Sequence, residues 1–584
     1  MRTPLSTLSL LILCSAAFAQ DFSPMWGTPI GGSASDRGYA IALDDAGHVH
    51  VAGTFNGIID VDPGPGTTTL TSAGMYDVFI AKFDTSGALV WARSFGGAHG
   101  DGVLAVTVDD QGNVYTTGGF CGTADFDPGP GSFTLTAATT GQSDIYISKL
   151  DANGDFVWAK GVVGGTWWDH GYGIAIDPAG NVVVTGRFYY QGGPRDFDPG
   201  PDTYFLTAGH EDVFELKLDT DGNFLWAVDF GIEPHESRGY SIAVDAAGNI
   251  FATGYFRGAV DFDPGPDTYV LTSVGTWNIF HLKLDPNGAL DWVNPLPIST
   301  TTYHSDPAYG RKITIDPEGN LLATGRFSGT IDFDPGAGTA ELTAVGSYDI
   351  YVAKYSNAGA FIWAKAMGGN GHDEGFSIGT DDQGRVLVSG RFSGTADFDP
   401  GADVLELTTM GGTDMYVLVL DADGELVHAG AFGGTADDQA QAIAMSGSGD
   451  IYCTGWISGP ADLDPGDGEF DVTSAGSEDA FLVKLALNDV TGVHAIGSGI
   501  PALAFFPNPA SRMVGIVVPA DFIGHAAMIE LIDATGRRMH RSRINALVPA
   551  QTIHLPAAMA NGCYTVRLRA DDATVMTGRL VVQR

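Results

Sequence analysis

Positive charge is scarce in this chain. Its 584 residues hold 29 Lys and Arg against 70 Asp and Glu, a formal net charge of −41 at pH 7. The imbalance lies in residues 21–487, where nineteen basic residues face sixty-four acidic ones. From residue 488 onwards nine Arg face six acidic residues. Such an acidic body repels nucleic acid and attracts cations, so we expect no nucleic-acid partner.

Cysteines and long apolar runs are also few. Arg2, the apolar stretch from Leu8 to Phe18 and the small residues around Ala19 predict a signal peptide over residues 1–19, cleaved after Ala19. No later run is long enough to span a membrane, so no transmembrane segment is expected after cleavage. Three cysteines remain, too few for a disulfide framework, and stability must come from packing or bound ions.

One five-residue motif recurs at long, regular intervals. The seven copies of Asp-x-Asp-Pro-Gly are spaced 65, 71, 65, 71, 65 and 65 residues apart. They begin at Asp60, Asp125, Asp196, Asp261, Asp332, Asp397 and Asp462. A fixed long period is typical of a repeat architecture.

Each repeat contains four short apolar or alternating runs. In the second copy they cover residues 103–108, 114–118, 144–150 and 155–159, and Asp/Asn-Gly turns close the hairpins. Four antiparallel strands per repeat predict a β-propeller blade. A solenoid is less favoured, because its repeats are usually shorter.

The two ends of the array predict a closed ring. The fourth strand recurs around Trp91, Trp158, Trp226, Trp292 and Trp363, and around His428 in the weakest copy. The last repeat lacks it, and a matching strand stands at residues 23–26. This N-terminal strand is expected to complete the last blade and so to remove two exposed sheet edges. We therefore predict an all-β fold, with a seven-bladed β-propeller of four-stranded blades over residues 20–487.

Structural roles are expected for two residue types that recur in the blades. Aromatic side chains at one position in every repeat usually pack blade against blade, which we expect of the Trp set. The third strand carries a Lys that we expect to pair with a nearby carboxylate or to lie on the solvated face. These residues are Lys82, Lys149, Lys217, Lys283, Lys354 and Lys484, with Val419 as the exception.

A longer pattern of glycines, aspartates and apolar residues is complete in the third repeat. It comprises Gly164-Gly165, Asp169 and the run from Ile174 to Gly186. The pattern Gly-Gly-x-x-x-Asp followed by Ile-Ala-Val-Asp-x-x-Gly-Asn-Val-Tyr-Val-Thr-Gly resembles the bacterial β-propeller repeat called SBBP. The resemblance covers about residues 22–487. It implies a propeller of the kind found in many surface proteins, including S-layer-like ones, and it implies little about function.

Acidic residues gather on the loops between the second and third strands. Each insert has two Asp two residues apart, and a third acid precedes the third strand except in the fourth copy, which has Asn278. Calcium prefers several carboxylate and carbonyl oxygens, often on a glycine-bearing turn. The candidate ligands are Asp60, Asp62, Asp77, Asp125, Asp127, Asp144, Asp196, Asp198, Asp212, Asp261, Asp263, Asp332, Asp334, Asp349, Asp397, Asp399, Asp414, Asp462, Asp464 and Asp479. The alternative is that these Asp accept backbone hydrogen bonds in Asx turns, which needs no metal.

Signals of an enzyme are thin. There is no His-x-x-x-His pair on a helix, no nucleophile elbow and no phosphate loop. Seven near-equal acid pairs argue against one tuned acid–base couple, which needs two different environments. We therefore expect no catalytic residue. The one irregular place is Trp167-Trp168 with Tyr189-Tyr190, which suggests a local carbohydrate-stacking patch.

The last residues change in composition. A glycine-containing linker at 488–500 leads to Phe505-Phe-Pro-Asn-Pro, an Asp-x-x-Gly turn at 533–536, Gly562-Cys-Tyr and a basic end. The alternating runs predict a small β-sandwich over residues 501–584. The four elements, in this order, resemble the C-terminal sorting domain of the type IX secretion system. The alternative is a generic adhesion-type sandwich.

That resemblance implies handling by the type IX secretion machinery and a destination outside a Gram-negative cell or on its surface. We expect a secreted or cell-surface, non-enzymatic propeller scaffold that binds cations or extracellular ligands such as surface polysaccharide or other surface proteins. Two alternatives are a carbohydrate-binding, adhesive lectin-like module and a polysaccharide-acting enzyme on the loop face.

Overall fold

The computed structural model describes residues 21–488, except 65, 233, 276, 299–307, 447–448 and 467, together with strands and single positions between 504 and 582. The described residues form strands, turns and bends, and none of them lies in a helix that could cross a membrane. The chain divides into two compact units, of which the larger is Asp21–Asn488 and the other includes the residues from 489 onwards. The signal peptide predicted at 1–19 and the linker predicted at 488–500 fall outside the described residues, except Asn488.

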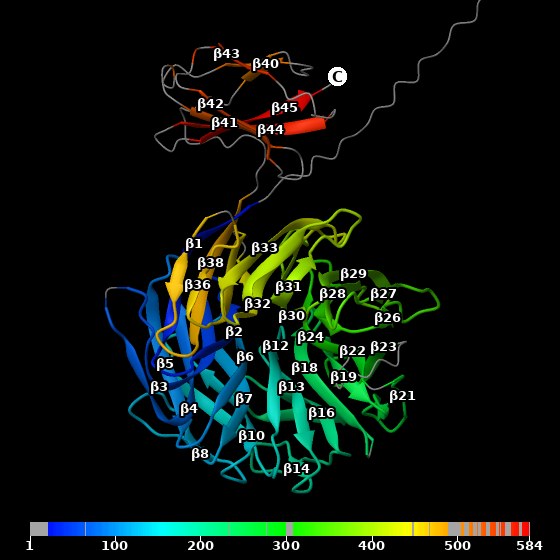
Figure 1. Cartoon of the computed structure of the whole chain (residues 1–584). Coiled ribbons are helices and arrows are strands. Elements are labelled where there is room, and N and C mark those ends of the chain that lie inside the picture. The colour runs from blue at the N-terminus through cyan, green and yellow to red at the C-terminus, as the bar shows by residue number, and fades with distance from the viewer. Residues whose placement is uncertain are drawn as a thin grey trace, which may run out of the picture. The chain divides into compact units, whose positions relative to one another are not determined.

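The larger unit consists of repeated groups of four antiparallel strands, and pairings between repeats join most of these groups into sheets of eight and ten strands (Figure 1). In the first three repeats the strands are β2 (Arg37–Leu43), β3 (Val49–Asp60), β4 (Thr69–Phe83), β5 (Leu89–Gly97); β6 (Gly102–Val108), β7 (Val114–Cys121), β10 (Ser143–Leu150), β11 (Phe156–Val162); and β12 (His170–Ile176), β13 (Val182–Tyr189), β16 (Glu211–Leu218), β17 (Phe224–Phe230). The next three have β18 (Glu236–Val244), β19 (Ile250–Arg257), β22 (Asn278–Leu284), β23 (Leu290–Leu296); β24 (Ala308–Ile315), β25 (Leu321–Phe327), β28 (Asp349–Tyr355), β29 (Phe361–Gly369); and β30 (Glu374–Thr380), β31 (Val386–Asp397), β32 (Glu406–Leu420), β33 (Leu426–Gly434). The last has β34 (Gln439–Met445), β35 (Asp450–Ile457), β38 (Asp479–Asn488) and β1 (Asp21–Gly32).

The N-terminal strand completes the last repeat, as predicted. β1 pairs antiparallel with β38, from Asp21 opposite Asn488 to Ile30 opposite Ala480. The first strands contact one another in chain order, β2, β6, β12, β18, β24, β30 and β34, and β34 also contacts β2. Figure 1 shows β2, β6, β12, β18, β24 and β30 together in the middle of the unit.

Each Asp-x-Asp-Pro-Gly insert is a small hairpin that the sequence did not predict. The hairpins are β8 (Thr123–Asp125) with β9 (Thr134–Thr136), β14 (Arg195–Asp196) with β15 (Phe205–Leu206), β20 (Ala259–Asp261) with β21 (Val270–Thr272), β26 (Thr330–Asp332) with β27 (Glu341–Thr343), and β36 (Pro460–Asp462) with β37 (Asp471–Thr473). In the first and sixth repeats the hairpin continues β3 and β4, and β31 and β32. In four repeats the insert also pairs with the end of the preceding repeat, for example Gly96 opposite Asp125.

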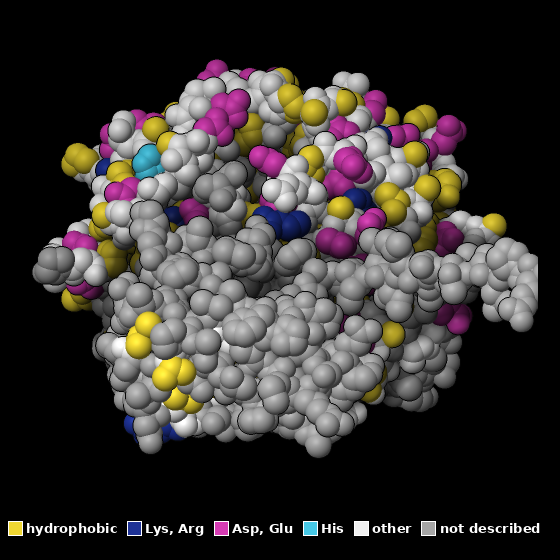
Figure 2. All heavy atoms as spheres, turned by 90° about the horizontal axis from the view of Figure 1, so that it is seen from above, with side chains coloured by type: hydrophobic (Ala, Val, Ile, Leu, Met, Phe, Trp, Pro, Cys, Tyr) yellow, Lys and Arg dark blue, Asp and Glu magenta, His cyan; other side chains and the backbone are white. Residues whose placement is uncertain are grey.

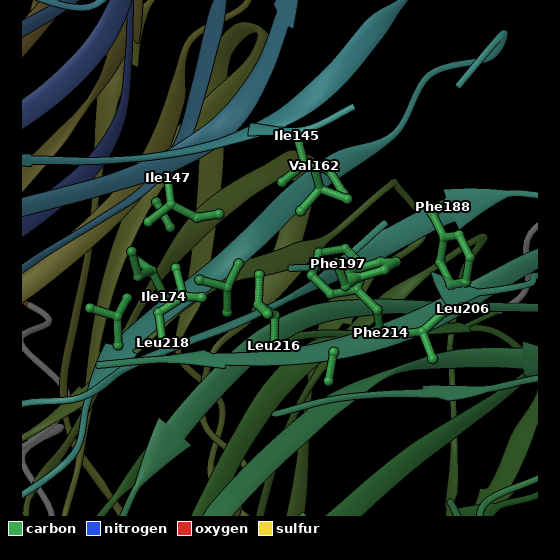
Figure 3. Close-up of a cluster of buried hydrophobic side chains, with 14 of the residues drawn as sticks. Ile145, Ile147, Val162, Ile174, Phe188, Phe197, Leu206, Phe214, Leu216 and Leu218 are labelled. Atoms are coloured by element: carbon green, nitrogen blue, oxygen red, sulfur yellow. The ribbon is translucent and has the colours of Figure 1, made fainter. Parts of the chain in front are cut away.

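The core lies between neighbouring repeats. Figure 3 shows Ile145, Ile147 and Val162 of the second repeat against Ile174 and Leu216 of the third. All five are buried or nearly so, because each sheet is apolar on both faces and covers the next. Similar clusters join the other repeats, including one that contains both Phe22 and Phe432.

The recurrent Trp residues join repeats, as predicted. Trp91 Nε1 donates to Ala152 O of the next repeat at 3.1 Å, and Trp292 Nε1 donates to Asn357 O at 3.0 Å. The rings pack on the glycine of the same turn: a Cβ on Gly154, where φ is +79°, would lie 3.0 Å from the Trp91 ring. The Trp set is therefore structural.

The third-strand Lys residues form the predicted ion pairs in most repeats. The pairs are Lys82–Asp44, Lys217–Asp177, Lys283–Asp291, Lys354–Asp316 and Lys484–Asp450, at 2.8 to 3.0 Å. Lys149 differs, because its Nζ donates to Thr220 O and lies over the Tyr115 ring.

The C-terminal unit contains two antiparallel sheets in its described residues. One has β39 (Ala504–Phe506), β40 (Met513–Val517) and β43 (Ala550–His554). The other has β42 (Arg538–Ile544), β41 (Ala527–Ile532), β44 (Gly562–Ala570) and β45 (Val575–Val582). Ile516, Ile529, Leu531, Val566 and Leu568 are fully buried.

Candidate functional site

The paired acids of the inserts serve the backbone. Asp60 Oδ1 accepts hydrogen bonds from the amides of Asp62 and Thr68, at 3.1 and 3.0 Å, and Asp62 Oδ1 accepts one from Gly64 at 2.8 Å. The same three bonds recur in every repeat, from Asp125 and Asp127 to Asp462 and Asp464. This is the Asx-turn geometry given above as the alternative to calcium.

The third acid caps a different loop. Asp77 Oδ2 accepts the amide of Ala73 at 2.7 Å, and Asn278 Oδ1 accepts that of Val274 in the fourth repeat. Among the described residues no three His, Cys, Asp or Glu side chains lie close enough to share a metal ion. The structure thus does not bring the third acid to the insert pair, and calcium binding by those three residues stays a prediction.

A cluster of arginines is the main feature that the sequence did not reveal. It comprises Arg37, Arg187, Arg238, Arg311, Arg326 and Arg391, six of the ten arginines in residues 21–487. They lie at the beginnings of first strands and the ends of second strands, at positions where other repeats carry different residue types. A single arginine is a common residue on a protein surface. Only the arrangement of the repeats brings these six arginines close together. We call this set the arginine cluster.

Three glutamates hold the arginine cluster together. Glu374 accepts Arg311 Nε at 2.7 Å and Arg326 Nη1 at 3.2 Å, and Arg391 Nη2 lies 3.5 Å from it. Three guanidinium groups keep the pKa of this carboxyl below its usual value although burial opposes them. Glu211 pairs in the same way with Arg187 and Arg238, and Glu478 binds Arg37 through two hydrogen bonds. Six positive charges against three negative ones leave an excess of positive charge.

Aromatic rings fill the spaces between these guanidinium groups. Arg311 lies 5.1 Å from the Tyr240 ring and 5.2 Å from Tyr309, and Arg37 lies 4.8 Å from the Trp456 ring. Tyr240 also packs edge-on against Tyr172 of the preceding repeat. The cluster therefore combines cationic and flat apolar groups, a combination that suits cation–π contacts and ring stacking.

A cavity of about 370 Å³ opens where the first three repeats meet. Small residues make the space: Thr54, Gly102 and Gly119 stand where other repeats carry large side chains of the arginine cluster. Arg37 and His170 lie among the lining residues. Burial, then the charges of Arg187 and Arg238, lower the pKa of His170 to about 3, so this imidazole is neutral at physiological pH.

Basic side chains are few among the acidic ones on the face shown in Figure 2. The concentration of arginine at one place in so acidic a unit is therefore a local reversal of charge. Such a reversal attracts anions that the rest of the unit repels.

The aromatic patch predicted in the third repeat is partly exposed. Trp168 is 53% exposed, Trp167 44% and Tyr190 45%, whereas Tyr189 is buried. Trp167 stands 6.0 Å from the Tyr189 ring. Trp168 is two residues from His170 of the cavity, so the patch and the cavity share one loop.

Comparison with known proteins defines first the class: an exported, β-rich protein. A family model described as the secretion system C-terminal sorting domain matches residues 504–583. This domain is handled by the type IX secretion machinery, and its bearers are secreted or held at the outer surface of Gram-negative bacteria. The resemblance inferred for the C-terminal residues is therefore confirmed.

Relatives of the repeated unit are distant. An uncharacterized WD repeat-containing protein of Acanthamoeba polyphaga mimivirus is 24% identical over 447 residues, 64% of this chain and 31% of that protein. Regulatory protein FlaEY of Caulobacter vibrioides is 27% identical over 160 residues, 27% of this chain and 15% of that protein. The chain thus spans less than a third of the length of the curated relatives it matches.

The solved structures that align with this chain are also only distantly similar to it. A Dyadobacter fermentans protein of unknown function aligns with a TM-score of 0.35 and 10% identity, over 80% of this chain and all of that one. A polysaccharide lyase described as an ulvan lyase aligns with a TM-score of 0.37 and 10% identity, over 78% of this chain and 97% of that one. At these values neither likeness says what this chain does.

Proposed function

We propose that residues 21–488 form a closed seven-bladed propeller of the SBBP type that binds acidic saccharides outside the cell, without catalysing a reaction. The contacts of the first strands in chain order, ending with β34 against β2, support the ring. The pairing of β1 with β38 supports closure by the N-terminal strand. A ring brings the arginine cluster to one end of its axis.

The observation that carries the ligand class is the arginine cluster beside the cavity. Guanidinium groups bind carboxylate and sulfate through charge-assisted hydrogen bonds. Arg37 lines the cavity and is 38% exposed at its side chain, so part of it faces solvent. Tyr39 and Tyr76, which also line the cavity, offer flat faces on which a sugar ring stacks. Sugars that carry carboxylate or sulfate groups match both features.

Binding is favoured over catalysis by the titratable groups at the cavity. A general base works best when its pKa lies near the working pH, and His170 is far below that range. Burial raises the pKa of Asp101, which also lines the cavity, to about 7. Its counterparts Asp36, Asp373 and Asp438 have the same backbone-capping role and pKa values raised to about 6, so this shift recurs among the repeats and does not mark one catalytic acid. A polysaccharide-acting enzyme on this face is the second candidate. The release of new reducing ends from an acidic polysaccharide would establish it.

Isothermal titration of the exported chain with polygalacturonate, a sulfated glycan and a neutral glucan tests the proposal. We expect the two acidic polymers to bind, the neutral glucan not to bind, and Arg37→Gln to weaken binding about tenfold or more, the value of a charge-assisted hydrogen bond. Lys365→Gln removes the same charge from β29, where the partner carboxylate of Glu425 is exposed, and should bind like the original chain. Equal binding of neutral and acidic polymers, or an unchanged Arg37→Gln variant, would contradict the proposal.

A further inference from the structure

Buried carboxylates face each other where consecutive repeats meet. The third acid of one repeat stands next to the acid of the Gly-Gly-x-x-x-Asp motif of the next. Burial raises the pKa of that second acid, and the charge of the third acid raises it further. The pairs are Asp479 with Asp36, Asp77 with Asp101, Asp144 with Asp169, Asp349 with Asp373, and Asp414 with Asp438. None of the ten residues is more than 3% exposed. We call them the boundary pairs.

The geometry of one boundary pair shows how close the two acids are. A Cβ built on Gly96 would lie 2.6 Å from Asp77 Oδ1 and 3.0 Å from Asp101 Oδ2. Asp101 accepts the amides of Gly97 and Cys121, and Asp77 Oδ2 accepts that of Ala73. Asp77 Oδ1 has no hydrogen-bond partner among the described residues, and the same is true of Asp414 Oδ1 in the sixth repeat. Two adjacent buried carboxylates need a counter-charge that these amides do not supply.

One boundary pair has its counter-charge within the chain. Arg195 is fully buried and donates through Nε to Asp169 Oδ2 at 2.9 Å. A Cβ on Gly165 would lie 2.5 Å from Asp169 Oδ2, 3.1 Å from Asp144 Oδ1 and 3.2 Å from Arg195 Nη2, so the guanidinium lies beside both acids. The residue before the first Asp of the insert is apolar in every other repeat: Ile59, Ala124, Val260, Ile331, Ala396 and Ala461. Within the described ranges no ion pair involves an acid of the other four boundary pairs.

A comparison of the other two boundaries between repeats shows whether loop capping requires the charge of a carboxylate. Between the fourth and fifth repeats the two positions hold Asn278 and Ala308, so both acids are missing together. Asn278 still caps its loop, at 2.6 Å from the Val274 amide. At the boundary between the third and fourth repeats, Asp212 has Ser237 in place of the second acid. Capping therefore does not require a carboxylate, and the retention of both acids at the other boundaries calls for a ligand that needs two negative charges.

We propose that the four boundary pairs without an arginine each bind a hard divalent cation, of which calcium is the type, in the place that the Arg195 guanidinium takes beside Asp144 and Asp169. Two carboxylates supply the charge, and carbonyl and water oxygens complete the shell of six to eight oxygens that calcium takes. The ligands are then residues of adjacent repeats, and the insert acids such as Asp60 and Asp62 are not among them. The pair of Asp36 and Asp479 joins the first and last repeats, so a cation there stabilises the ends of the array against separation.

Calcium content and thermal unfolding of the mature chain test this inference. After dialysis against CaCl₂ at pH 8 we expect four calcium ions per chain, and a melting temperature that falls when EDTA replaces calcium. Asp77→Asn, which copies the natural Asn278, should bind three, and the double variant Asp77→Asn/Asp414→Asn should bind two. Asp60→Asn is the matched control in an insert and should keep all four.

Three results would overturn the inference. The first is that no calcium binds and the melting temperature is the same in calcium and in EDTA. The second is an equal loss of calcium in Asp60→Asn and Asp77→Asn. The third is a melting temperature that rises on acidification but does not change with calcium. The last result would mean that the boundary pairs share protons. If Asp77→Asn does not fold, Asp414→Asn alone gives the same count of three. Saccharide binding at the arginine cluster is measured separately, so either proposal can fail without the other.

Discussion

Asp316 and Lys354 show how single residues hold the turn between the first and second strands. Lys354 Nζ lies 2.8 Å from Asp316 Oδ2, and the two side chains are 6% and 1% exposed. Burial alone would raise the pKa of Asp316, but hydrogen bonds from Lys354 and Asn320 bring it below its usual value. The carboxylate is therefore charged, and it depends on its partners to remain so in a buried place.

In the sixth repeat a different residue binds the corresponding carboxylate. Val419 replaces the Lys, and Arg385 Nε donates to Asp381 Oδ2 at 2.6 Å from the position that Asn320 holds in the fifth repeat. The second repeat also differs, because Lys149 does not pair with a carboxylate there. Asn113 and Tyr115 bind Asp109 instead. The partner of this Asp varies, but the Asp always has one in these repeats.

We predict that Lys354→Val lowers the free energy of unfolding by about 3 to 5 kcal/mol, because it leaves a buried carboxylate without its cation. The double change Lys354→Val/Asn320→Arg copies the sixth repeat and should recover most of this loss. Urea unfolding of both variants measures the difference. A double variant as unstable as the single one would show that the two repeats are not equivalent at this site.

At the scale of elements, the Gly-Gly motif has a steric cause. The second glycine pairs with the insert of the next repeat, and a Cβ there would meet a carbonyl oxygen: on Gly369 it would lie 2.0 Å from Thr395 O, and on Gly97 2.2 Å from Thr123 O. These distances are too short for any side chain. The motif therefore allows the end of one repeat to pair with the insert of the next.

We predict that Gly369→Ala destabilises the chain by about 1 to 3 kcal/mol, the usual cost of forcing a methyl group into a filled space. Gly379→Ala is the matched control, since a Cβ on Gly379 in β30 meets no atom within 4 Å. Thermal unfolding should leave the control within about 0.5 kcal/mol of the original chain. Equal losses in the two variants would refute the steric explanation.

Local patterns in the sequence were sufficient for the strands but not for the contacts between repeats. The run predicted at 144–150 is observed at Ser143–Leu150, because alternation and Asp/Asn-Gly turns are local signals. The three-residue strand Thr123–Asp125 was missed, since it is too short to show a period and forms by pairing with β9 and with Gly96 and Gly97 of the preceding repeat. The arginine cluster was missed for a similar reason: Arg187 and Arg311 lie 124 residues apart, and no local pattern connects them.

At the scale of the molecule, the arrangement depends on β1. Residues 21–30 lie 450 or more positions in sequence from the residues of β38 with which they pair. Phe22 and Ile30 are buried in the clusters that contain residues of the last repeat. Without β1, the backbone groups of β38 would be unpaired on one side, and exposed strand edges pair with other chains.

We therefore predict that a mature chain beginning at Arg37 self-associates, because its unpaired β38 edge accepts a strand from another copy. Size-exclusion chromatography with light scattering should find dimers or larger species, and a synthetic peptide of residues 21–32 should restore monomers by filling the edge. The matched control ends at Asn488 and keeps both β1 and β38, so it should remain monomeric although it lacks the sorting domain. If the chain beginning at Arg37 stays monomeric without the peptide, the pairing of β1 with β38 does not protect that edge, and the closure we propose has lost its main physical consequence.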